Sequence, residues 1–539
     1  MNRTPPLLSR RQWLAVTAGA GLELALAQKA GAQTADRRSP AELDRDWLKA
    51  TAKYAPERAR LLATMDKAKT DGPFLPDWGS LQHYRTPNWY ADAKFGIFVH
   101  WGLYSLPAFG SEWYSRNMYV KDSPEYAHHI ATYGPHTQFG YKDFIPKFKA
   151  EHFDPAAWTS LFRDAGARYI VPVAEHHDGF SMYDTHLSDY SAVKMGPKRD
   201  IVGEVKAAAK SHGLHFCLSS HRAEHDWFFD EGRKFPSDVS DPAQAGLYGP
   251  AQSRIVGPNS DDLFSDYTYV SQYWLDDWLA RQAELVQRYS PDLIYFDWWI
   301  GQPSFRNTLP KFLAYYYNFA ARHGGSAVVN YKLGEFADGA GTLDIERGQA
   351  AEIRKDVWQT CTSISDKSWG YIENDTYKSV EQIVHLLADV VSKNGNLLLN
   401  VGPRADGRIP ETARDTLLAV GRWLKGNGDA IYGTRPWRVF GEGPTETANG
   451  TFAESKAKPY TPRDFRFTTR PGLLYAIQLG QPEGAKVTIA SIQGGTAVKR
   501  VSLLGSDAPV RFEMTDTGLT LTLPMDVPRQ PATVYRIEI

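Results

Sequence analysis

The sequence predicts an α/β protein whose catalytic domain is a (β/α)8-like (TIM) barrel, followed by a C-terminal antiparallel β-sandwich. Two observations predict the barrel. Apolar segments alternate with segments of helical spacing, as in parallel sheets whose strands are covered on both faces. The apolar segments also end in polar residues, and parallel barrels carry their chemistry at the carboxyl ends of the strands. Short alternating runs after about residue 436 predict the sandwich.

The polar ends of the predicted strands form a recurring pattern. The run "KFGIFVHWG" ends at His100, and "RYIVPVAEHHDGF" changes from apolar residues to Glu175, His176 and His177. The runs "GLHFCLSSHRAEH", "PDLIYFDWW", "SAVVNYK" and "NLLLNVGP" end in the same way. Such side chains are costly to bury without partners, so their recurrence indicates a site. An open doubly wound sheet would also bind ligands at this edge, but its glycine pattern is not found in the sequence.

The segments between these strands carry helix signals. Asp154 and Pro155 supply an N-cap and a first-turn proline, and Ser379 with Gln382 forms a capping box. Helical spacing is clear in "DIVGEVKAAAKSHG", "SQYWLDDWLARQAELVQRYS" and "LPKFLAYYYNFAARHG". A charged helix within about residues 40–80 is expected on the outside of the barrel. Residues 226–266 are rich in Gly, Pro, Asp and Ser and predict a long loop on the active-site side.

Three regions are expected: an export signal (residues 1–32), the barrel (40–435) and the sandwich (436–539). Arg10 and Arg11 precede a moderately apolar stretch and a small-residue end, a pattern typical of a bacterial twin-arginine signal. Glu23 interrupts that stretch, so an ordinary disordered basic N-terminus stays open as the alternative. A periplasmic or secreted protein is expected. No other segment is apolar enough to span a bilayer, so no membrane insertion is expected.

Composition narrows the class of ligand. The 539 residues carry a net charge of −1 without a basic stripe, which gives nucleic-acid binding no electrostatic support. Aromatic residues make up 13% of the chain and include 16 Trp, which suits either a large core or carbohydrate contacts. Cys217 and Cys361 both lie in predicted strands, which favours buried free thiols over a disulfide.

The stretch "HRAEH", His221 to His225, matches the spacing of one class of zinc peptidase. That chemistry requires both histidines on one face of a helix, whereas this stretch follows an apparent strand. His176 and His177 are consecutive residues, whose side chains point to opposite sides of a strand end, so they are poor joint metal ligands. As neutral imidazoles, both can donate and accept hydrogen bonds, as a site for a hydroxylated ligand requires.

Six ordered segments resemble glycoside hydrolase family 29, the α-L-fucosidases. They are "FGIFVHWGLYSLPAFGSEWY", "AEHHDGF", "PDLIYFD", "WQTCTSISDKSWGY", "GNLLLNVGPRADGRIP" and "VGRWLKGNGDAIYGT", within residues 85–440. The stretch "DFRFTTRPGLLYAIQL" is similar to that family's β-sandwich. The resemblance implies an exo-acting retaining α-L-fucosidase that hydrolyses fucosylated oligosaccharides or glycoconjugates. No cofactor and no metal are expected, and the sequence does not indicate an oligomeric state.

The resemblance also implies roles for individual residues. Asp297 corresponds to the nucleophile, and Glu346, in "GTLDIERG", to an acid/base on a glycine-containing loop. Other carboxylates that could serve as the acid/base are Glu175, Glu224 and Glu335. The residues expected to bind the sugar are His100, Glu112, Trp113, His176, His177, His221, Glu224, Trp299 and Lys332.

The chain departs from the family pattern at several positions. Glu175 stands where a lysine is common, and Lys332 stands near the acid/base where an arginine is common. Ser219 and Ser220, followed by "HRAEH", replace tyrosines on the third strand. These departures leave the linkage preference open and suggest that His221 or Glu224 shapes the site. Three alternatives remain: a retaining glycosidase for another sugar, an inactive sugar-binding module and a zinc hydrolase. The sandwich is expected to support the barrel rather than do chemistry.

Overall fold

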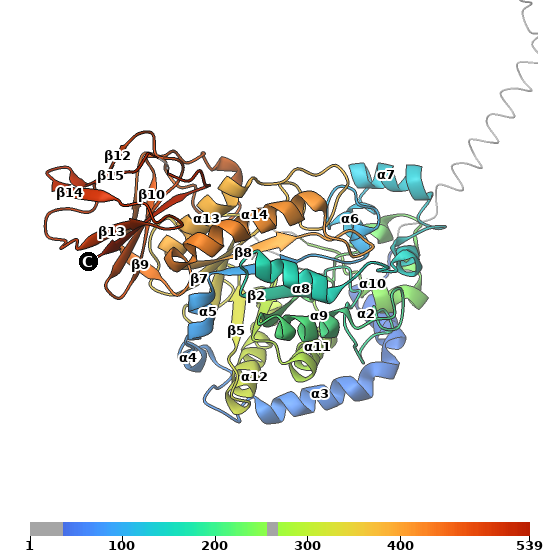
Figure 1. Ribbon diagram of the computed structural model, residues 1–539. Coiled ribbons are helices and arrows are strands. Elements are labelled where there is room, and N and C mark those ends of the chain that lie inside the picture. Colours follow the sequence, from blue (N-terminus) through green and yellow to red (C-terminus); the bar gives the residue numbers. More distant parts are fainter. Residues whose placement is uncertain (1–35, 256–267, 526) are drawn as a thin grey trace, which may run out of the picture.

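The computed structural model describes residues 36–255, 268–525 and 527–539, and its centre is a closed barrel of parallel strands (Figure 1). β1 pairs with both β2 and β8, so the sheet has no open edge. The predicted (β/α)8 architecture is confirmed. The strands are β1 (Phe95–Val99), β2 (Tyr169–Glu175), β3 (His215–Ser220), β4 (Leu293–Phe296), β5 (Val328–Tyr331), β6 (Thr342–Glu346), β7 (Trp358–Ser363) and β8 (Gly395–Val401).

The barrel strands are apolar along their length because both of their faces are buried. In β2, the alternate residues Tyr169, Val171 and Val173 belong to the cluster that fills the barrel, while the residues between them pack against the helices. Cys217 and Cys361 lie in the same inner cluster as buried free thiols, as expected.

Helices cover the outside of the barrel (Figure 1). The N-cap predictions hold: the Asp154 carboxylate accepts from the backbone N–H of Ala156, and Ser379 and Gln382 form the reciprocal capping box. Residues 332–341 and 347–357 join β5, β6 and β7 without a helix. The covering helices are α8 (Pro155–Asp164), α9 (Ile201–Ser211), α11 (Gln272–Tyr289), α12 (Leu309–Arg322), α13 (Val380–Ser392) and α14 (Glu411–Asn427).

The expected outer helix is a pair, α2 (Pro40–Ala50) and α3 (Ala55–Ala68). Arg58 of α3 forms a buried ion pair with Asp277 of α11, 2.7 Å away, which fixes α3 against the barrel helices. The expected 226–266 loop contains short helical turns, and its residues 256–266 lie outside the described part, as does the predicted export signal. Shorter helices are α4 (Trp78–Leu81), α5 (Asn88–Ala93), α6 (Tyr114–Asn117), α7 (Pro124–Tyr133) and α10 (Ala245–Tyr248).

The C-terminal region forms two antiparallel sheets that pack beside α13 and α14 (Figure 1). Arg466 of β10 donates to the Asp389 carboxylate of α13, which also pairs with Lys393, so buried charges join the two regions. One sheet has the order β13-β16-β11-β10-β9 and the other β12-β15-β14. Their strands are β9 (Arg435–Glu442), β10 (Phe465–Arg470), β11 (Leu473–Gln478), β12 (Lys486–Ile489), β13 (Arg500–Leu503), β14 (Arg511–Thr515), β15 (Gly518–Thr522) and β16 (Thr533–Glu538).

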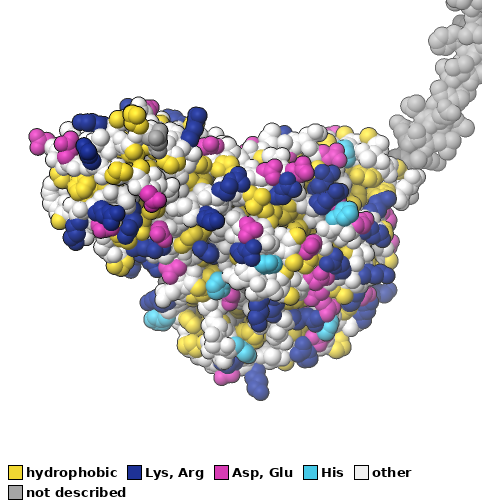
Figure 2. Space-filling view, in the orientation of Figure 1, with side chains coloured by type: hydrophobic (Ala, Val, Ile, Leu, Met, Phe, Trp, Pro, Cys, Tyr) yellow, Lys and Arg dark blue, Asp and Glu magenta, His cyan; other side chains and the backbone are white. Residues whose placement is uncertain are grey.

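The surface carries charges of both signs, which are interspersed over the face shown in Figure 2. Among the described residues, we find no helix that combines the length and the apolar character needed to cross a bilayer.

Candidate active site

The carboxyl ends of the barrel strands surround a small cavity of about 200 Å³. β1, β2, β3 and β4 are each followed by a residue of this cavity, and β6 ends in one. Nine of the residues predicted from the sequence line it: His100, Glu112, Trp113, His176, His177, His221, Glu224, Asp297 and Glu346.

Two predicted sugar-binding residues do not line the cavity. Trp299 is buried against Trp227, with ring centroids 5.0 Å apart, and its neighbour Trp298 faces the cavity instead. A φ of 90° at Trp299 turns the chain there and directs the two consecutive indoles to different sides. Lys332 lies beneath the cavity, with a fully buried side chain that contacts the carboxylates of the site.

Five lining residues were not predicted: Phe98, Tyr295, Trp298, Trp369 and Phe452. Two of them had a usable signal. Phe98 and Tyr295 precede His100 and Asp297 by two positions, and the two-residue repeat of a strand directs such pairs to one side. Trp369 follows β7, whereas Phe452 comes from the chain between β9 and β10 and has no local signal.

Glu346 does not lie on a loop, as the sequence had suggested. It is the last residue of β6, a buried strand in "TLDIE", between Gly341 and Gly348. The glycines made this segment resemble a flexible loop, but they flank a short strand of alternating residues. Because β6 pairs with β7 from Asp344 to Glu346, the Glu346 backbone is fixed by the barrel.

Asp297 is held as a carboxylate by cations and hydrogen-bond donors. Its Oδ2 atom lies 3.1 Å from His221 Nδ1 and 3.5 Å from His177 Nε2, and its Oδ1 atom lies 3.7 Å from Lys332 Nζ. Burial alone would raise the pKa of Asp297, but these three groups outweigh it and hold the pKa well below its usual range. Asp297 is therefore ionised, which is the state that a nucleophilic carboxylate requires.

Glu224 and His177 form a second ionisable pair at the cavity. His177 Nδ1 lies 3.9 Å from Glu224 Oε2. Burial opposes a charge on His177, but the carboxylates of Glu224 and Asp297 outweigh it and raise its pKa to about 9. Burial also raises the pKa of Glu224, to about 7, although His177 pulls it down. At neutral pH, His177 is thus a cation beside Asp297.

His100 and His176 remain neutral. Burial is the main cause that lowers the pKa of each well below 6.5. Asn400 Nδ2 donates to the carbonyl oxygen of Trp369, which leaves Asn400 Oδ1 to accept from His100 Nδ1, 2.7 Å away. His100 Nε2 is then an acceptor. His176 Nδ1 is buried without a protein partner, so it can bond a ligand hydroxyl.

Lys332 joins the two predicted catalytic carboxylates. Its Nζ atom lies 2.9 Å from Oε2 of Glu346, 2.9 Å from Oδ2 of Asp344 and 2.5 Å from the hydroxyl of Tyr295. Trp298 Nε1 donates to the same Glu346 oxygen at 2.8 Å, which leaves Oε1 to carry a proton. Burial is the largest influence on Glu346 and raises its pKa, although Lys332 opposes this.

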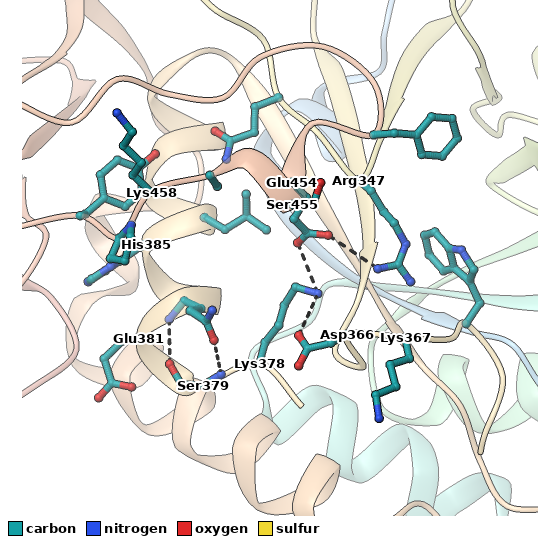
Figure 3. Close-up of a pocket in the computed structure, with 18 of the residues that line it drawn as sticks. Arg347, Asp366, Lys367, Lys378, Ser379, Glu381, His385, Glu454, Ser455 and Lys458 are labelled. Atoms are coloured by element: carbon teal, nitrogen blue, oxygen red, sulfur yellow. Dashed lines mark hydrogen bonds and ion pairs between the residues drawn. The ribbon is translucent and has the colours of Figure 1, made fainter. Parts of the chain in front are cut away.

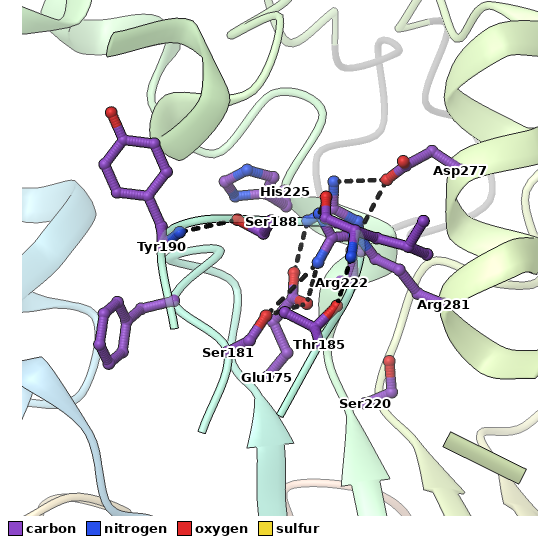
Figure 4. Close-up of polar contacts among 12 residues, drawn as sticks. Glu175, Ser181, Thr185, Ser188, Tyr190, Ser220, Arg222, His225, Asp277 and Arg281 are labelled. Carbon is purple, nitrogen blue, oxygen red and sulfur yellow. Dashed lines mark hydrogen bonds and ion pairs between the residues drawn. The ribbon is translucent and has the colours of Figure 1, made fainter. Parts of the chain in front are cut away.

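The competing carboxylates Glu175 and Glu335 have structural partners instead. Arg222 and Arg281 both bind Glu175, at 2.5 and 3.0 Å, and both also bind Asp277 at 2.9 Å (Figure 4). Burial would raise the pKa of Asp277, but its arginine partners outweigh this and lower it. Glu335 accepts from the backbone N–H of Lys332 at 2.8 Å. Neither Glu175 nor Glu335 lines the cavity.

The histidines of "HRAEH" do not come together as a zinc site. His225 Nδ1 lies 2.7 Å from the carbonyl oxygen of His177, and its ring stacks on Trp274. Among the described residues, two groups place possible ligand atoms within 4.8 Å of one another, and His225 belongs to neither. These groups are His100, His176 and His221, and His177, His221 and Asp297.

The C-terminal region does more than support the barrel. Gly450 and Phe452 donate backbone hydrogen bonds to the carbonyls of Gln349 and Glu346, at 2.9 and 2.8 Å. A Cβ on Gly348 would lie 1.8 Å from the carbonyl oxygen of Gly450, so this close approach requires glycine. Phe452 therefore forms part of the cavity wall. That the C-terminal domain does no chemistry of its own stays a prediction.

A closed (β/α) barrel that ends in two carboxylates and several imidazoles around a cavity of this size defines a barrel glycoside hydrolase. A family model described as alpha-L-fucosidase matches residues 61–429. The chain belongs to this α-L-fucosidase family.

Individual relatives span most of the chain. The tissue alpha-L-fucosidase of Rattus norvegicus is 32% identical over 84% of this chain and 88% of its own. The corresponding protein of Homo sapiens is 31% identical over 85% and 89%. The crystal structure of Thermotoga maritima alpha-fucosidase in complex with fucose matches with a TM-score of 0.68 and 31% identity, over 86% of this chain and 100% of that one.

Proposed function

We propose that this protein is an exo-acting retaining α-L-fucosidase that releases terminal α-L-fucose from oligosaccharides or glycoconjugates. The observation that carries the proposal is that Asp297 and Glu346 line one small cavity and share the ammonium of Lys332. The relatives named as fucosidases support the choice of sugar. A cavity of about 200 Å³ suits a single terminal sugar ring. Imidazoles and Glu112 can hold its hydroxyls, and aromatic residues can face its methyl group.

The spacing of the carboxylates fits a double displacement. Lys332 Nζ is 3.7 Å from one oxygen of Asp297 and 2.9 Å from one oxygen of Glu346. The sum of these distances is the upper bound on the separation of the two oxygens, and it accommodates the roughly 5–5.5 Å of retaining glycosidases. An ionised Asp297 beside a Glu346 of raised pKa supplies a nucleophile and an acid together.

In the first step, Asp297 attacks the anomeric carbon as the bond to the leaving oxygen breaks. Glu346 gives its proton to that oxygen, and a fucosyl ester of inverted configuration forms. In the second step, the Glu346 carboxylate takes a proton from water, and the resulting oxygen attacks the same carbon. The ester bond breaks, Asp297 is released, and fucose leaves with its original configuration.

Glu346 is a better candidate than Glu224 for the acid/base. Both line the small cavity, and burial raises the pKa of both. Arg347, the residue after Glu346, lines a second cavity that adjoins the first, on the side where a leaving group can extend. Glu224 instead pairs with His177, and neither Ala223 nor His225 beside it lines the second cavity.

Lys332 has a positioning role in this proposal. Its fully buried ammonium orients Glu346 and balances Asp344, and a sugar in the cavity would not need to touch it. When Asp297 becomes an ester and loses its charge, the same ammonium favours the ionised form of Glu346 that the second step requires.

A panel of aryl glycosides, assayed with and without a chelator, tests the function. Hydrolysis of the aryl α-L-fucoside, insensitive to the chelator, is the expected result. If the protein hydrolyses only the aryl glycoside of another sugar, that sugar is the substrate in place of fucose. Activity abolished by the chelator would favour the zinc alternative. Fucose binding without turnover of any substrate would indicate a binding module.

We also propose that the protein is exported and acts in the periplasm or outside the cell. Support comes from the paired Arg10 and Arg11 before an apolar stretch. Replacing both arginines with lysine should retain the folded protein in the cytoplasm, as fractionation and activity assays can show. Unchanged export of that variant would contradict the proposal.

A further inference from the structure

A second and larger cavity, of about 1080 Å³, opens beside the small one (Figure 3). The ends of β6 and β7 form its floor, through residues such as Arg347 and Asp366. The first turns of α13 form one wall. Residues 452–460, which include the short turn Glu454–Lys456, form the opposite wall. This groove therefore lies between the barrel and a segment of the C-terminal region.

The groove is continuous with the small cavity. Glu112, Trp369 and Phe452 line both of them, so they mark the junction. Glu346 lies on the small-cavity side of this junction, and Arg347, the next residue, lies on the groove side. A group bonded to the anomeric oxygen of a bound sugar would pass Glu346 and enter the groove.

The charged groups of the groove are balanced in number, and four of them form ion pairs. Arg347 and Lys378 lie 3.7 and 3.3 Å from the two oxygens of Glu454, and Lys378 lies 3.9 Å from Asp366 (Figure 3). Equal numbers of cations and anions give no net attraction to a charged ligand, whereas hydroxyl groups can accept from the cations and donate to the carboxylates. The lining cations are Arg347, Lys367, Lys378 and Lys458, and the anions are Glu112, Asp366, Glu381 and Glu454.

Aromatic faces at the junction suit sugar rings. Phe452 is 52% exposed and stacks on Trp298 with centroids 6.0 Å apart. Its φ of 58° is uncommon outside glycine and costs about 1–3 kcal/mol, and such strain persists at functional sites. The guanidinium of Arg347 covers the ring of Trp369, 4.9 Å from the centroid.

We propose that this groove binds the sugar units on the leaving-group side of the scissile bond, in a neutral oligosaccharide several rings long. The inference rests on the proposed fucosidase function and specifies its substrate class. The volume, the junction beside Glu346, the balanced charges and the exposed aromatic ring all point to this ligand. The enzyme therefore prefers fucosylated oligosaccharides over small fucosides.

Two neighbouring residues of one turn provide a matched test. Ser455 is exposed and lines the groove, whereas Lys456 is exposed and does not. Ser455→Trp should obstruct the groove, and Lys456→Trp should leave it open. The substrates are 4-nitrophenyl α-L-fucoside and neutral oligosaccharides of two to four rings with a terminal α-L-fucose. In the unmodified protein, kcat/KM should rise about tenfold from the shortest oligosaccharide to the longest.

Ser455→Trp should remove that rise and keep activity on the nitrophenyl fucoside, and Lys456→Trp should keep both. Ala457→Trp, on the same wall, repeats the test if the first variant does not fold. Absence of the length dependence, or its survival in a folded blocking variant, would overturn the inference.

Calorimetry with a neutral tetrasaccharide that lacks fucose separates this inference from the proposed function. It should bind the unmodified protein and Lys456→Trp, and bind Ser455→Trp at least about tenfold more weakly. If the tetrasaccharide binds but the protein has no fucosidase activity, the groove is a binding site for neutral sugars and the proposed function is wrong. Absence of binding, or tighter binding of a tetrasaccharide with an acidic sugar, would overturn the groove assignment whatever the activity.

Discussion

Lys332 places its ammonium 2.9 Å from a carboxylate oxygen of Glu346, and no part of the lysine side chain is exposed. The same ammonium also contacts Asp344 and lies 3.7 Å from Asp297. The ionisation of the two proposed catalytic residues is therefore linked through a single group that the sugar does not need to touch.

Replacing Lys332 with methionine should move the pH profile of kcat/KM to higher pH. The ammonium lowers the pKa of both Asp297 and Glu346, so its loss raises both values. The acid limb reports the nucleophile and the alkaline limb reports the acid, so both limbs should move in the same direction. The measurement is a pH–rate profile of the folded variant.

Lys332→Arg is the matched control, because it keeps the charge and should keep both limbs near their original positions. An unchanged profile in a folded Lys332→Met protein would contradict the linkage. Lys332→Met leaves Asp344 without its cation and should also lose about 3–5 kcal/mol of unfolding free energy, so the folding of this variant must be checked first.

Leaving-group dependence should separate Glu346 from Glu224. Glu346→Ala should slow substrates with poor leaving groups far more than activated aryl fucosides, because only poor leaving groups need the proton. Added azide should accelerate this variant and give a product of retained configuration. Glu224→Ala should instead reduce kcat/KM to a similar extent for all leaving groups, since Glu224 acts on His177. The opposite pattern would transfer the acid/base role to Glu224.

Glu175→Gln should destabilise the protein without a specific effect on catalysis. The change leaves buried Arg222 and Arg281 with less compensating charge and should cost about 3–5 kcal/mol, measured by urea unfolding. Glu204→Gln, which breaks a partly exposed pair with Arg199, should cost no more than about 1 kcal/mol. A large fall in kcat at full stability would return Glu175 to the list of catalytic candidates.

Phe452→Ala should lower kcat/KM although the residue belongs to the C-terminal region. The ring stacks on Trp298, whose indole N–H holds Glu346. Loss of an aromatic contact is worth about 0.5–1.5 kcal/mol, so a decrease of about two- to tenfold is expected. Phe512→Ala, at an exposed ring on β14, should leave the rate unchanged. If Phe452→Ala has the same kcat/KM as Phe512→Ala, the Phe452 ring does not contribute to catalysis by the barrel.

The fold followed from the sequence because buried parallel strands and covering helices leave strong local patterns. The strand-end residues His100, His177 and Asp297 could be found in the same way, since a barrel gathers the ends of its strands. The strand that carries Glu346 was missed because its flanking glycines resemble those of a loop.

Other features depend on contacts between distant segments. Phe452 reaches the cavity because residues 450–454 pair with the end of β6 and the chain after it, more than a hundred positions earlier. The partners of Glu175 come from the turn after β3 and from α11, so its structural role could not be seen beside the His pair. Spacing rules describe one element at a time and do not predict such pairings.

The most direct test of the proposed mechanism is the fate of Asp297→Gly. This variant should lose nearly all turnover of an aryl α-L-fucoside, because the carboxylate that attacks the anomeric carbon is removed. Sodium azide should restore part of the rate and yield a fucosyl azide of inverted, β configuration, identified by NMR. Near-normal turnover without azide, or an azide product of retained configuration, would contradict the assignment of Asp297 as the nucleophile.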